Sequence, residues 1–227
     1  MRFIMAALAA ATLLAAHPVH AQRTDASGVP FYAWDAHASV GLHLSSARDA
    51  GDREPDLYDR DMEGTGAFGL DLGRYWTSHL KTEVGVQVRP HWTAYSQQPI
   101  QLDTGQLAYA THRTEISVTQ LQFGGMWQFL ENTFAHPYLG AGVRFGIVSA
   151  HERRDPTVWV FDGRRYEYQD VPPYEQRRNH LLVRPFVAGG FKSYFNERAF
   201  VRPEVATAFN ADGVSQWTLR VGFGVDF

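Results

Sequence analysis

Charged side chains recur inside segments whose alternate positions are apolar. Glu204, for example, lies between Pro203 and Val205, and Arg220 lies between Leu219 and Val221. Burial of such groups is costly unless acids and bases pair, so we expect them to form ion pairs within one enclosed space. The predicted charge network comprises Asp71, Glu83, Arg89, Arg144, Arg184, Lys192, Arg202, Glu204 and Arg220.

Histidine and serine residues carry the groups for two other kinds of chemistry. A serine activated by a histidine and an acid attacks an ester or amide, and converging histidines bind metal ions. The candidates are His91, His112, His151 and His180, with Ser96, Ser117 and Ser149. None of them has a partner at a spacing typical of a catalytic or metal site. We therefore predict no catalytic residue, no metal site and no cofactor.

The charged residues lie on segments that alternate with a period of two. From Trp217 to Phe227 every second residue is apolar, which predicts a β-strand with one apolar and one polar face. The same pattern predicts seven more strands, at 34–45, 67–76, 83–91, 114–130, 137–149, 181–195 and 199–210.

One of these segments, 114–130, does not keep a single phase. Ile116 and Val118 are out of step with Leu121 and Phe123. Either a bulge near 119–120 shifts the register, or the first part of the strand turns its apolar side inward.

The length of the strands and their polar faces favour a membrane barrel over a soluble sandwich. A strand that crosses a membrane needs about 9–11 residues, whereas a typical soluble strand has about 5–6. In a closed barrel the apolar side chains contact lipid and the charged ones pair in the lumen, where glycines make room for them. The predicted fold class is all-β: an eight-stranded antiparallel up-and-down transmembrane β-barrel after a cleaved signal peptide. Its interior is only wide enough for side chains, so we predict a plugged lumen.

The first 21 residues have the features of a secretory signal peptide. Arg2 precedes an apolar run that ends with Val19, His20 and Ala21. We predict a signal peptide at 1–21, a short periplasmic segment at 22–30 and a barrel domain at 31–227. The net charge of −3 argues against a nucleic-acid partner, and the absence of cysteine excludes disulfides.

The connections between the predicted strands alternate in length. Short turns at 77–80, 131–134 and 196–198 alternate with long connections at 46–66, 97–113 and 152–180, as in outer-membrane barrels. Within the last of these, residues 158–168 are predicted to form a hairpin with Asp162 and Gly163 at its tip. Aromatic residues at strand ends are predicted to form membrane-interface girdles. They are Trp34, Tyr75, Trp76, Trp127, Phe129, Tyr138, Tyr194, Phe195 and Phe227 at one end, and Trp92, Tyr95, Phe209 and Trp217 at the other.

Two arginine pairs flank this third long connection. Guanidinium groups bind phosphates bidentately, so we predict that Arg153, Arg154, Arg177 and Arg178 contact the phosphates of lipopolysaccharide. The alternative is a solvated loop whose acids offset the arginines.

The first long connection, 46–66, is acidic, and its signal for a divalent ion is weak.

The pattern resembles the small eight-stranded outer-membrane barrels of Gram-negative bacteria, the OmpA-like and OmpW-like barrel domains. The resemblance is carried by the boundary VHA–Gln at 19–22, GRYWTSHLKTEVGV at 73–86, YLGAGVRFGI at 138–147 and VGFGVDF at 221–227. It covers residues 31–227 and implies location in the outer membrane. It also implies that Phe223, Val225 and Phe227 form the signal read by the outer-membrane assembly machinery.

We therefore predict a monomeric, non-catalytic outer-membrane barrel with an envelope-structural or surface-interaction role and a plugged, charged lumen. Its expected partners are outer-membrane lipid, lipopolysaccharide and the assembly machinery. One alternative is a narrow channel for small solutes, which a conductance measurement would detect. Another is a lipid A-modifying enzyme, a deacylase or acyltransferase, which mass spectrometry of lipid A would detect.

Overall fold

The computed structural model describes residues 22–24, 30–46, 62–130, 135–161, 164–211 and 213–227, and its regular elements there are all β-strands. The strands are β1 (Gln22–Thr24), β2 (Pro30–Tyr32), β3 (Trp34–Ser46), β4 (Met62–Tyr75), β5 (Leu80–Gln101), β6 (Leu107–Gln128), β7 (Ala135–Arg154), β8 (Thr157–Phe161), β9 (Tyr166–Asp170), β10 (Glu175–Tyr194), β11 (Ala199–Asn210) and β12 (Gly213–Asp226). In the described ranges, no helix has the length and apolar character needed to cross a membrane. The predicted signal peptide at 1–21 lies outside the described residues.

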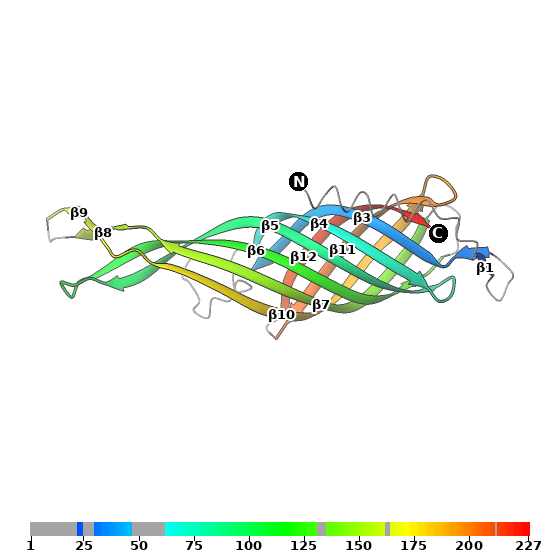
Figure 1. The fold of residues 1–227 in the computed structure, drawn as a ribbon, viewed down its shortest axis with the longest axis horizontal. Helices are drawn as coiled ribbons and strands as arrows, with labels where there is room; N and C mark the ends of the chain where they lie inside the picture. The colour runs from blue at the N-terminus through cyan, green and yellow to red at the C-terminus, as the bar shows by residue number, and fades with distance from the viewer. Residues whose placement is uncertain (1–21, 25–29, 47–61, 131–134, 162–163, 212) are drawn as a thin grey trace.

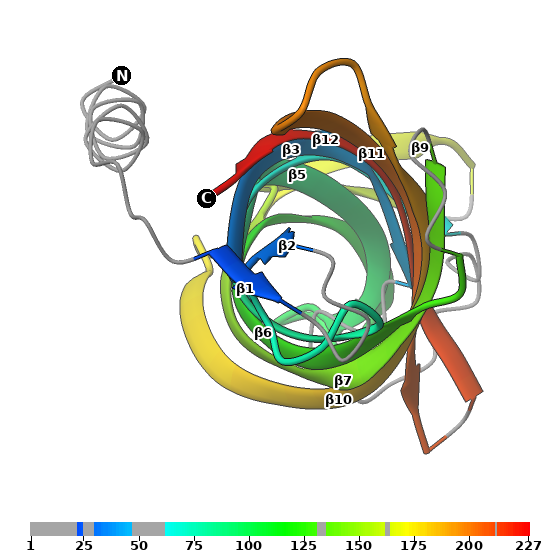
Figure 2. The same ribbon diagram turned by 90° about the vertical axis from the view of Figure 1, so that its right-hand side faces the viewer.

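Eight of the strands close into an antiparallel barrel (Figures 1 and 2). Their order is β5-β4-β3-β12-β11-β10-β7-β6, and β6 pairs again with β5. The seam between β3 and β12 extends to the last residue, because Trp34 and Phe227 exchange backbone hydrogen bonds of 3.0 and 2.9 Å. In the part of the barrel where all eight described strands run side by side, closure pairs each strand on both edges, which a structure surrounded by lipid requires. The predicted eight-stranded barrel is confirmed.

The alternation of side chains gives the barrel an apolar exterior. Val40, Phe68, Ile147 and Phe223 expose between 53% and 60% of their surface, and comparable apolar side chains surround the barrel. Asp35, Asp71, Arg144 and Arg220, which lie on the same strands, are buried inside. Apolar side chains outside and ionic side chains inside are the arrangement that a hydrocarbon solvent requires.

One side of the barrel extends far beyond the other (Figure 1). The neighbouring strands β5, β6, β7 and β10 have 20 to 22 residues, whereas β3, β4, β11 and β12 have 12 to 14. Beyond the short strands, the long ones carry the hairpin β8–β9, which joins β6 through the pair Tyr109–Trp159. We call this part, residues 92–113 and 149–179, the outer extension. Its small apolar core consists of Leu102, Ala108, Ala110, Val158, Val160 and Val171.

Two of the predicted long loops are therefore wrong. Residues 97–113 belong largely to β5 and β6, which are joined by a turn at 102–106, and much of 152–180 is strand. The predicted hairpin near 158–168 is confirmed by the pairing of β8 with β9, while its tip lies outside the described residues. So does most of the predicted loop 46–66.

Of the two alternatives for segment 114–130, the structure has the one in which the first part of the strand turns its apolar side inward. β6 alternates without interruption, so Ile116 and Val118 face the lumen in phase with Gln120, and no bulge occurs near 119–120. The irregularity lies in β5, between the pairs Arg89–Val118 and Trp92–Ile116. Inside the barrel, an apolar layer lies further out along β7 than Arg144. It contains Ile116, Val118, Val148 and Ala150, with Leu182 packed against them.

The short turns at 77–80 and 196–198 lie at the end of the barrel opposite the outer extension. The hydroxyl of Thr77 accepts hydrogen bonds from the backbone N–H groups of His79 and Leu80, at 3.2 and 2.9 Å. Short side chains that satisfy backbone donors in this way are typical of tight turns. The β1–β2 hairpin and the C-terminus lie at this same end (Figure 1).

The predicted aromatic girdle is partly wrong. Trp76, Trp127 and Phe195 are exposed on the outside, as expected for an interface. Tyr75 and Tyr138 are instead buried in the lumen, because they are in phase with the charged positions and their hydroxyls reach acids. The side chain of Trp92 lies outside the described residues.

Candidate functional site

The end of the lumen nearest the short turns contains ion pairs around two lysines. Lys192 Nζ lies 3.0 Å from Asp35 Oδ2 and 2.5 Å from Asp226 Oδ1. Lys81 Nζ lies 2.7 Å from the same Asp35 oxygen and 2.8 Å from Glu83 Oε2. All five side chains are buried, so each charge has its counter-charge in direct contact.

A chain of alternating acids and bases continues this network outward. Arg202 donates to Glu83 through both terminal nitrogens and to Glu204 Oε2 at 2.6 Å. Arg220 donates from Nε to Glu204 Oε1 at 2.7 Å and from Nη1 to Asp71 Oδ2 at 3.0 Å. The two guanidinium groups thus connect β11 and β12 to β4 and β5 across the lumen.

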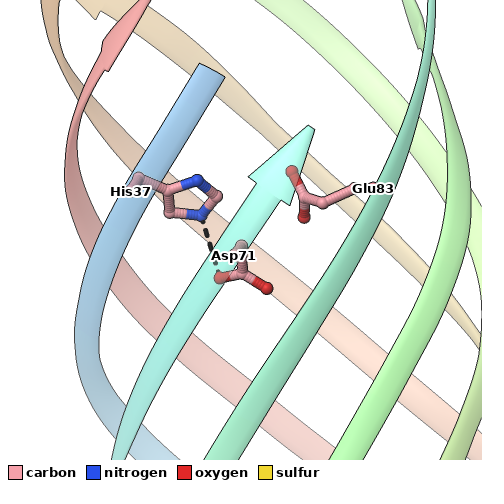
Figure 3. Close-up of side chains that lie close together, drawn as sticks. All are labelled: His37, Asp71 and Glu83. Carbon is pink, nitrogen blue, oxygen red and sulfur yellow. Dashed lines mark ion pairs between the residues drawn. The ribbon is translucent and has the colours of Figure 1, made fainter. Parts of the chain in front are cut away.

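Three members of the network have a composition that could hold a metal ion. His37, Asp71 and Glu83 point toward one another from β3, β4 and β5, and their ligand atoms lie within 4.8 Å of each other (Figure 3). His37 Nε2 lies 3.0 Å from Asp71 Oδ2. The carboxylates already contact Arg220 at 3.0 Å and Lys81 at 2.8 Å, and these cations would repel a divalent ion. The arrangement favours an ion-pair network over a metal centre.

Glycine is required where the network crosses a strand. A Cβ atom at Gly85 would lie 1.8 Å from Asp71 Oδ1, and one at Gly73 would lie 2.2 Å from Asp35 Oδ1. Any larger residue would displace a carboxylate from its partners. The predicted function of the lumen glycines, to make room for long side chains, agrees with this geometry.

A second group of charges, further out, has a different composition. Arg89, Arg144 and Arg184 are buried, and Arg144 and Arg184 are directly opposite in the β7–β10 register. Arg89 donates to Ser45 Oγ at 3.2 Å and Arg144 to Thr218 Oγ1 at 3.4 Å. Among the described residues, Arg144 forms no ion pair. We call these three arginines the cationic layer.

The structure places all nine residues of the predicted charge network on inward positions, but in two separate groups. It adds four that sequence reasoning missed, Asp35, His37, Lys81 and Asp226. Asp35, His37 and Asp226 had a detectable signal, because they occupy the polar phase of their strands. Lys81 had none, because the predicted strand began at residue 83 and β5 begins at Leu80.

On the outside, just beyond the apolar belt, the long strands carry two cross-strand rows of polar residues. The rows are Tyr95–Arg113–Arg153–Glu175 and Thr93–Glu115–His151–Arg177, and we call these eight residues the polar collar. Glu175 Oε1 lies 2.6 Å from His151 and 3.8 Å from both Arg153 and Arg177. The hydrogen bond with His151, aided by the arginines, lowers the pKa of Glu175 from its ordinary value of 4.5.

The four arginines predicted to contact lipopolysaccharide divide between two faces. Arg153 and Arg177 belong to the outward collar, whereas Arg154 and Arg178 occupy the opposite phase. Arg154 donates to the carbonyl of Pro172, and Arg178 donates to Gln176 Oε1 at 2.6 Å. Arg153 and Arg177 therefore point to the opposite side from Arg154 and Arg178, because adjacent strand residues point to opposite sides.

The histidine and serine candidates are dispersed, with one exception. His91 is exposed at the β5 irregularity, and Ser117 pairs in register with Ser149. His112 Nδ1 lies 2.6 Å from Glu152 Oε1, while its Nε2 is buried without a hydrogen-bond partner. Ser96 is opposite His112 in the strand register.

No protein-family model matches the sequence, and no curated protein matches it. Among solved structures, the chain is similar to the N-terminal β-barrel domain of OprF from Pseudomonas aeruginosa, with 11% identity, a TM-score of 0.47 and coverage of 86% of this chain and 98% of that chain. It is also similar to Neisserial surface protein A, with 10% identity, a TM-score of 0.48 and coverage of 86% and 96%. Ail, the attachment invasion locus protein of Yersinia pestis, has 12% identity, a TM-score of 0.46 and coverage of 87% and 100%.

The barrel's own architecture defines its class. A closed antiparallel barrel of eight strands, an exposed apolar belt and a buried ionic interior are the features of a small outer-membrane barrel. The described strands therefore form a transmembrane β-barrel, the fold class that the sequence predicted.

Proposed function

We propose that the protein is a non-catalytic surface-interaction protein that binds lipopolysaccharide along the outward face of its outer extension, while its lumen stays closed. One observation carries the proposal. The same outward face passes from the apolar belt to the polar collar and then to a row of exposed aromatic rings.

The polar collar has the position and chemistry to bind phosphates. Arg177 is four residues beyond Leu181, an apolar residue of the belt, which is about 13 Å along the strand at about 3.3 Å per residue. Arg113 and Arg153 are directly opposite in register, so a phosphate between them would relieve their repulsion. Guanidinium groups bind phosphate with paired, charge-assisted hydrogen bonds.

The aromatic row has the chemistry to contact sugar rings. Tyr109 pairs with Trp159, and Trp159 with Tyr168 at a ring-centroid distance of 3.7 Å. These side chains expose 66%, 53% and 65% of their surface, although they stand on a sheet with its own apolar core. Large rigid rings with a polar edge bind through their faces at low entropic cost. Tyr109 is four residues beyond Arg113, so the sugars of a lipopolysaccharide would follow its phosphates along this face.

The content of the lumen supports the closed state. The ion network joins opposite walls through Arg202 and Arg220, and the apolar layer of β6 and β7 lies beyond it. An eight-stranded barrel leaves room for side chains only. This argues against the narrow-channel alternative, which requires a continuous water path.

The test compares two variants that remove the same charge from opposite faces. The purified barrel is titrated with lipopolysaccharide in detergent, and bound lipopolysaccharide is quantified. Arg153→Gln with Arg177→Gln should weaken binding by more than tenfold, because each lost charge-assisted contact contributes about 1.5–3 kcal/mol and about 1.4 kcal/mol corresponds to tenfold. The control, Arg154→Gln with Arg178→Gln, should bind as the wild type does. Equal binding by all three proteins would refute the proposal, and single-channel steps in planar bilayers would refute the closed lumen.

A hydrolase is the second candidate, and the geometry of His112 favours it. A carboxylate on Nδ1 with an unpartnered Nε2 is the orientation of a general base. The test is mass spectrometry of lipid A from cells that produce the wild type or His112→Gln. Identical lipid A in producing and non-producing cells would eliminate this candidate.

A further inference from the structure

Arg74 is a charged residue on the apolar outside of the barrel. On β4 it has the same phase as Phe68, Leu70 and Leu72, whose side chains expose 57%, 46% and 37% of their surface. The other acidic and basic side chains described on the short strands β3, β4, β11 and β12 are buried in the lumen. Arg74 is two residues beyond Leu72, or about 7 Å along an extended strand. It therefore marks the end of the apolar belt nearest the short turns.

Arg74 forms no ion pair with another described residue. Its Cζ lies 4.2 Å from the centre of the Trp76 ring and 5.3 Å from the centre of the Trp34 ring. Asp35 and Asp71 lie on the same pair of strands, but their carboxylates contact Lys81 and Arg220 in the lumen. Arg74 itself is half-buried and accessible. Contact with aromatic rings leaves the N–H donors of a guanidinium group available to an anion.

The two indole rings hold the guanidinium group in place. Trp34 is directly opposite Arg74 in the β3–β4 register, and Thr82 is directly opposite it in the β4–β5 register. Directly opposite residues share one face of a sheet, so all of these side chains lie on the outside. Trp76 Nε1 donates a hydrogen bond of 3.0 Å to Thr82 Oγ1, which fixes the ring that Arg74 contacts. A side chain already held in one position loses less entropy when a ligand binds.

The position of Arg74 determines which anion it meets. Tryptophan side chains at the edge of an apolar belt lie at the level of the lipid headgroups. The anionic group that every glycerophospholipid has at this level is the phosphate next to its glycerol. A guanidinium group binds phosphate with two parallel, charge-assisted hydrogen bonds. Because the site is continuous with the apolar belt, a lipid fits it better than a soluble anion or a protein partner.

We propose that Arg74, with Trp34 and Trp76, binds the phosphate of one glycerophospholipid in the leaflet at the short-turn end of the barrel. The acyl chains of this lipid lie along Leu72 and Leu70. The site is at the opposite end of the barrel from the polar collar, so it is independent of the lipopolysaccharide contacts proposed there.

The first test measures lipid retention by native mass spectrometry. The full barrel, in an uncharged detergent, is mixed with equal amounts of phosphatidylglycerol and diacylglycerol that have identical acyl chains. The wild type should retain phosphatidylglycerol in preference, because diacylglycerol lacks the phosphate. Inorganic phosphate in excess should not displace the bound lipid. Equal retention of the two lipids would overturn the proposal, and so would displacement by inorganic phosphate, which would identify a site for the free ion.

Variants of Arg74 locate the effect. Arg74→Gln should lower the apparent affinity for phosphatidylglycerol about tenfold or more, which is the loss expected for one charge-assisted hydrogen bond. Arg74→Lys keeps the charge but not the two-donor edge, and its loss should be smaller. The control Arg198→Gln removes the same charge at the same end, where Arg198 contacts Tyr32 of β2, and should bind as the wild type does. Equal affinities of Arg74→Gln and the wild type, or equal losses in Arg74→Gln and Arg198→Gln, would contradict the proposal.

A second pair of variants tests the contribution of the ring. Trp76→Leu should weaken the retention of phosphatidylglycerol, because Arg74 loses the ring that holds it. Trp127→Leu removes a ring that is exposed to a similar degree but is stacked on His79, and retention should be unchanged. Equal effects of the two substitutions would show that the rings bind lipid without Arg74, which would overturn the assigned site.

A measurement on the wild type keeps the proposal testable if the variants do not fold. Crystals grown from a lipid phase that contains phosphatidylglycerol should show a lipid phosphate within hydrogen-bond distance of the Arg74 guanidinium group. Lipid phosphates bound only elsewhere on the barrel, or a protein carboxylate in contact with Arg74, would overturn the proposal.

Discussion

Arg202 is the residue whose removal should damage the barrel most. It contacts Glu83 through both terminal nitrogens, Glu204 at 2.6 Å and the Tyr138 hydroxyl at 2.7 Å. Arg202→Met leaves two buried carboxylates with fewer counter-charges. Removal of one partner from a buried ion pair costs about 3–5 kcal/mol of unfolding free energy. Glu83 keeps Lys81 at 2.8 Å and Glu204 keeps Arg220 at 2.7 Å, so we expect the lower part of that range.

The assay is a urea titration of the refolded barrel in detergent, followed by tryptophan fluorescence and by the mobility of unboiled protein on a gel. A double-mutant cycle separates the ion pair from other effects. Glu83→Gln alone should also destabilise, because Arg202 then loses one of its two acids. The double variant should be more stable than the sum of the two single losses predicts, by about 1–3 kcal/mol, since the uncompensated charge is removed.

Two results would refute this reasoning. Loss of less than about 1 kcal/mol in Arg202→Met would mean that water solvates the pair, as at a protein surface. Additive losses in the double variant would mean that Arg202 and Glu83 do not interact through charge. Either result would also remove the main support for a closed lumen.

Three further predictions concern other parts of the barrel. Gly142→Ala should lower the unfolding free energy by about 1–3 kcal/mol, because the new Cβ would lie 2.1 Å from the Phe123 carbonyl oxygen. The control, Gly125→Ala, places a Cβ with nothing within 4 Å and should be neutral in the same urea titration. Val221→Arg, on the apolar belt, should cost about 2–4 kcal/mol in lipid, whereas Tyr95→Arg in the collar should cost about 0–1 kcal/mol; equal costs would contradict the assigned position of the membrane. The pKa of Glu175 is lowered, so the ionised side chain stabilises the fold above its ordinary pKa of 4.5, and this stabilisation is lost as the pH falls through the lowered pKa. His151→Gln should raise the pKa of Glu175 in an NMR titration. An unchanged pKa would exclude the hydrogen bond between His151 and Glu175.

The membrane-spanning part of the fold could be predicted from sequence because lipid requires every spanning strand to have apolar residues on its outward face. β11 covers Ala199–Asn210, the range that alternation predicted. The outer extension could not be predicted in the same way, because its surroundings change from lipid to water. From the irregularity in β5 outward, some apolar residues face inward, such as Ile116 and Val118, and small residues such as Ala108 and Ala110 contribute to a core. A rule that places the apolar face of every strand on the outside of the barrel therefore fails where the strand leaves the membrane.

The candidate site was predictable residue by residue but not pair by pair. Period two alone assigns Glu83 and Arg202 to the lumen, yet they are 119 residues apart in sequence and belong to strands that are not neighbours in the barrel. Their contact depends on strand stagger and on the reach of the arginine across the lumen, which no local pattern encodes. The division of Arg153 from Arg154, in contrast, follows from period two once both are assigned to a strand.

The distribution of charge along the lumen determines what the barrel could conduct if it opened. Among the described residues, five acids face four cations in the ion network, whereas Arg89, Arg144 and Arg184 lie further out. Any water path along the axis must pass Arg144, which forms no ion pair with another described residue and would repel a cation in a low dielectric. Current through a variant with a weakened network, such as Arg202→Met, should therefore be anion-selective. A cation-selective current would show that the cationic layer does not lie on the path, and that the arginines are neutralised within the protein.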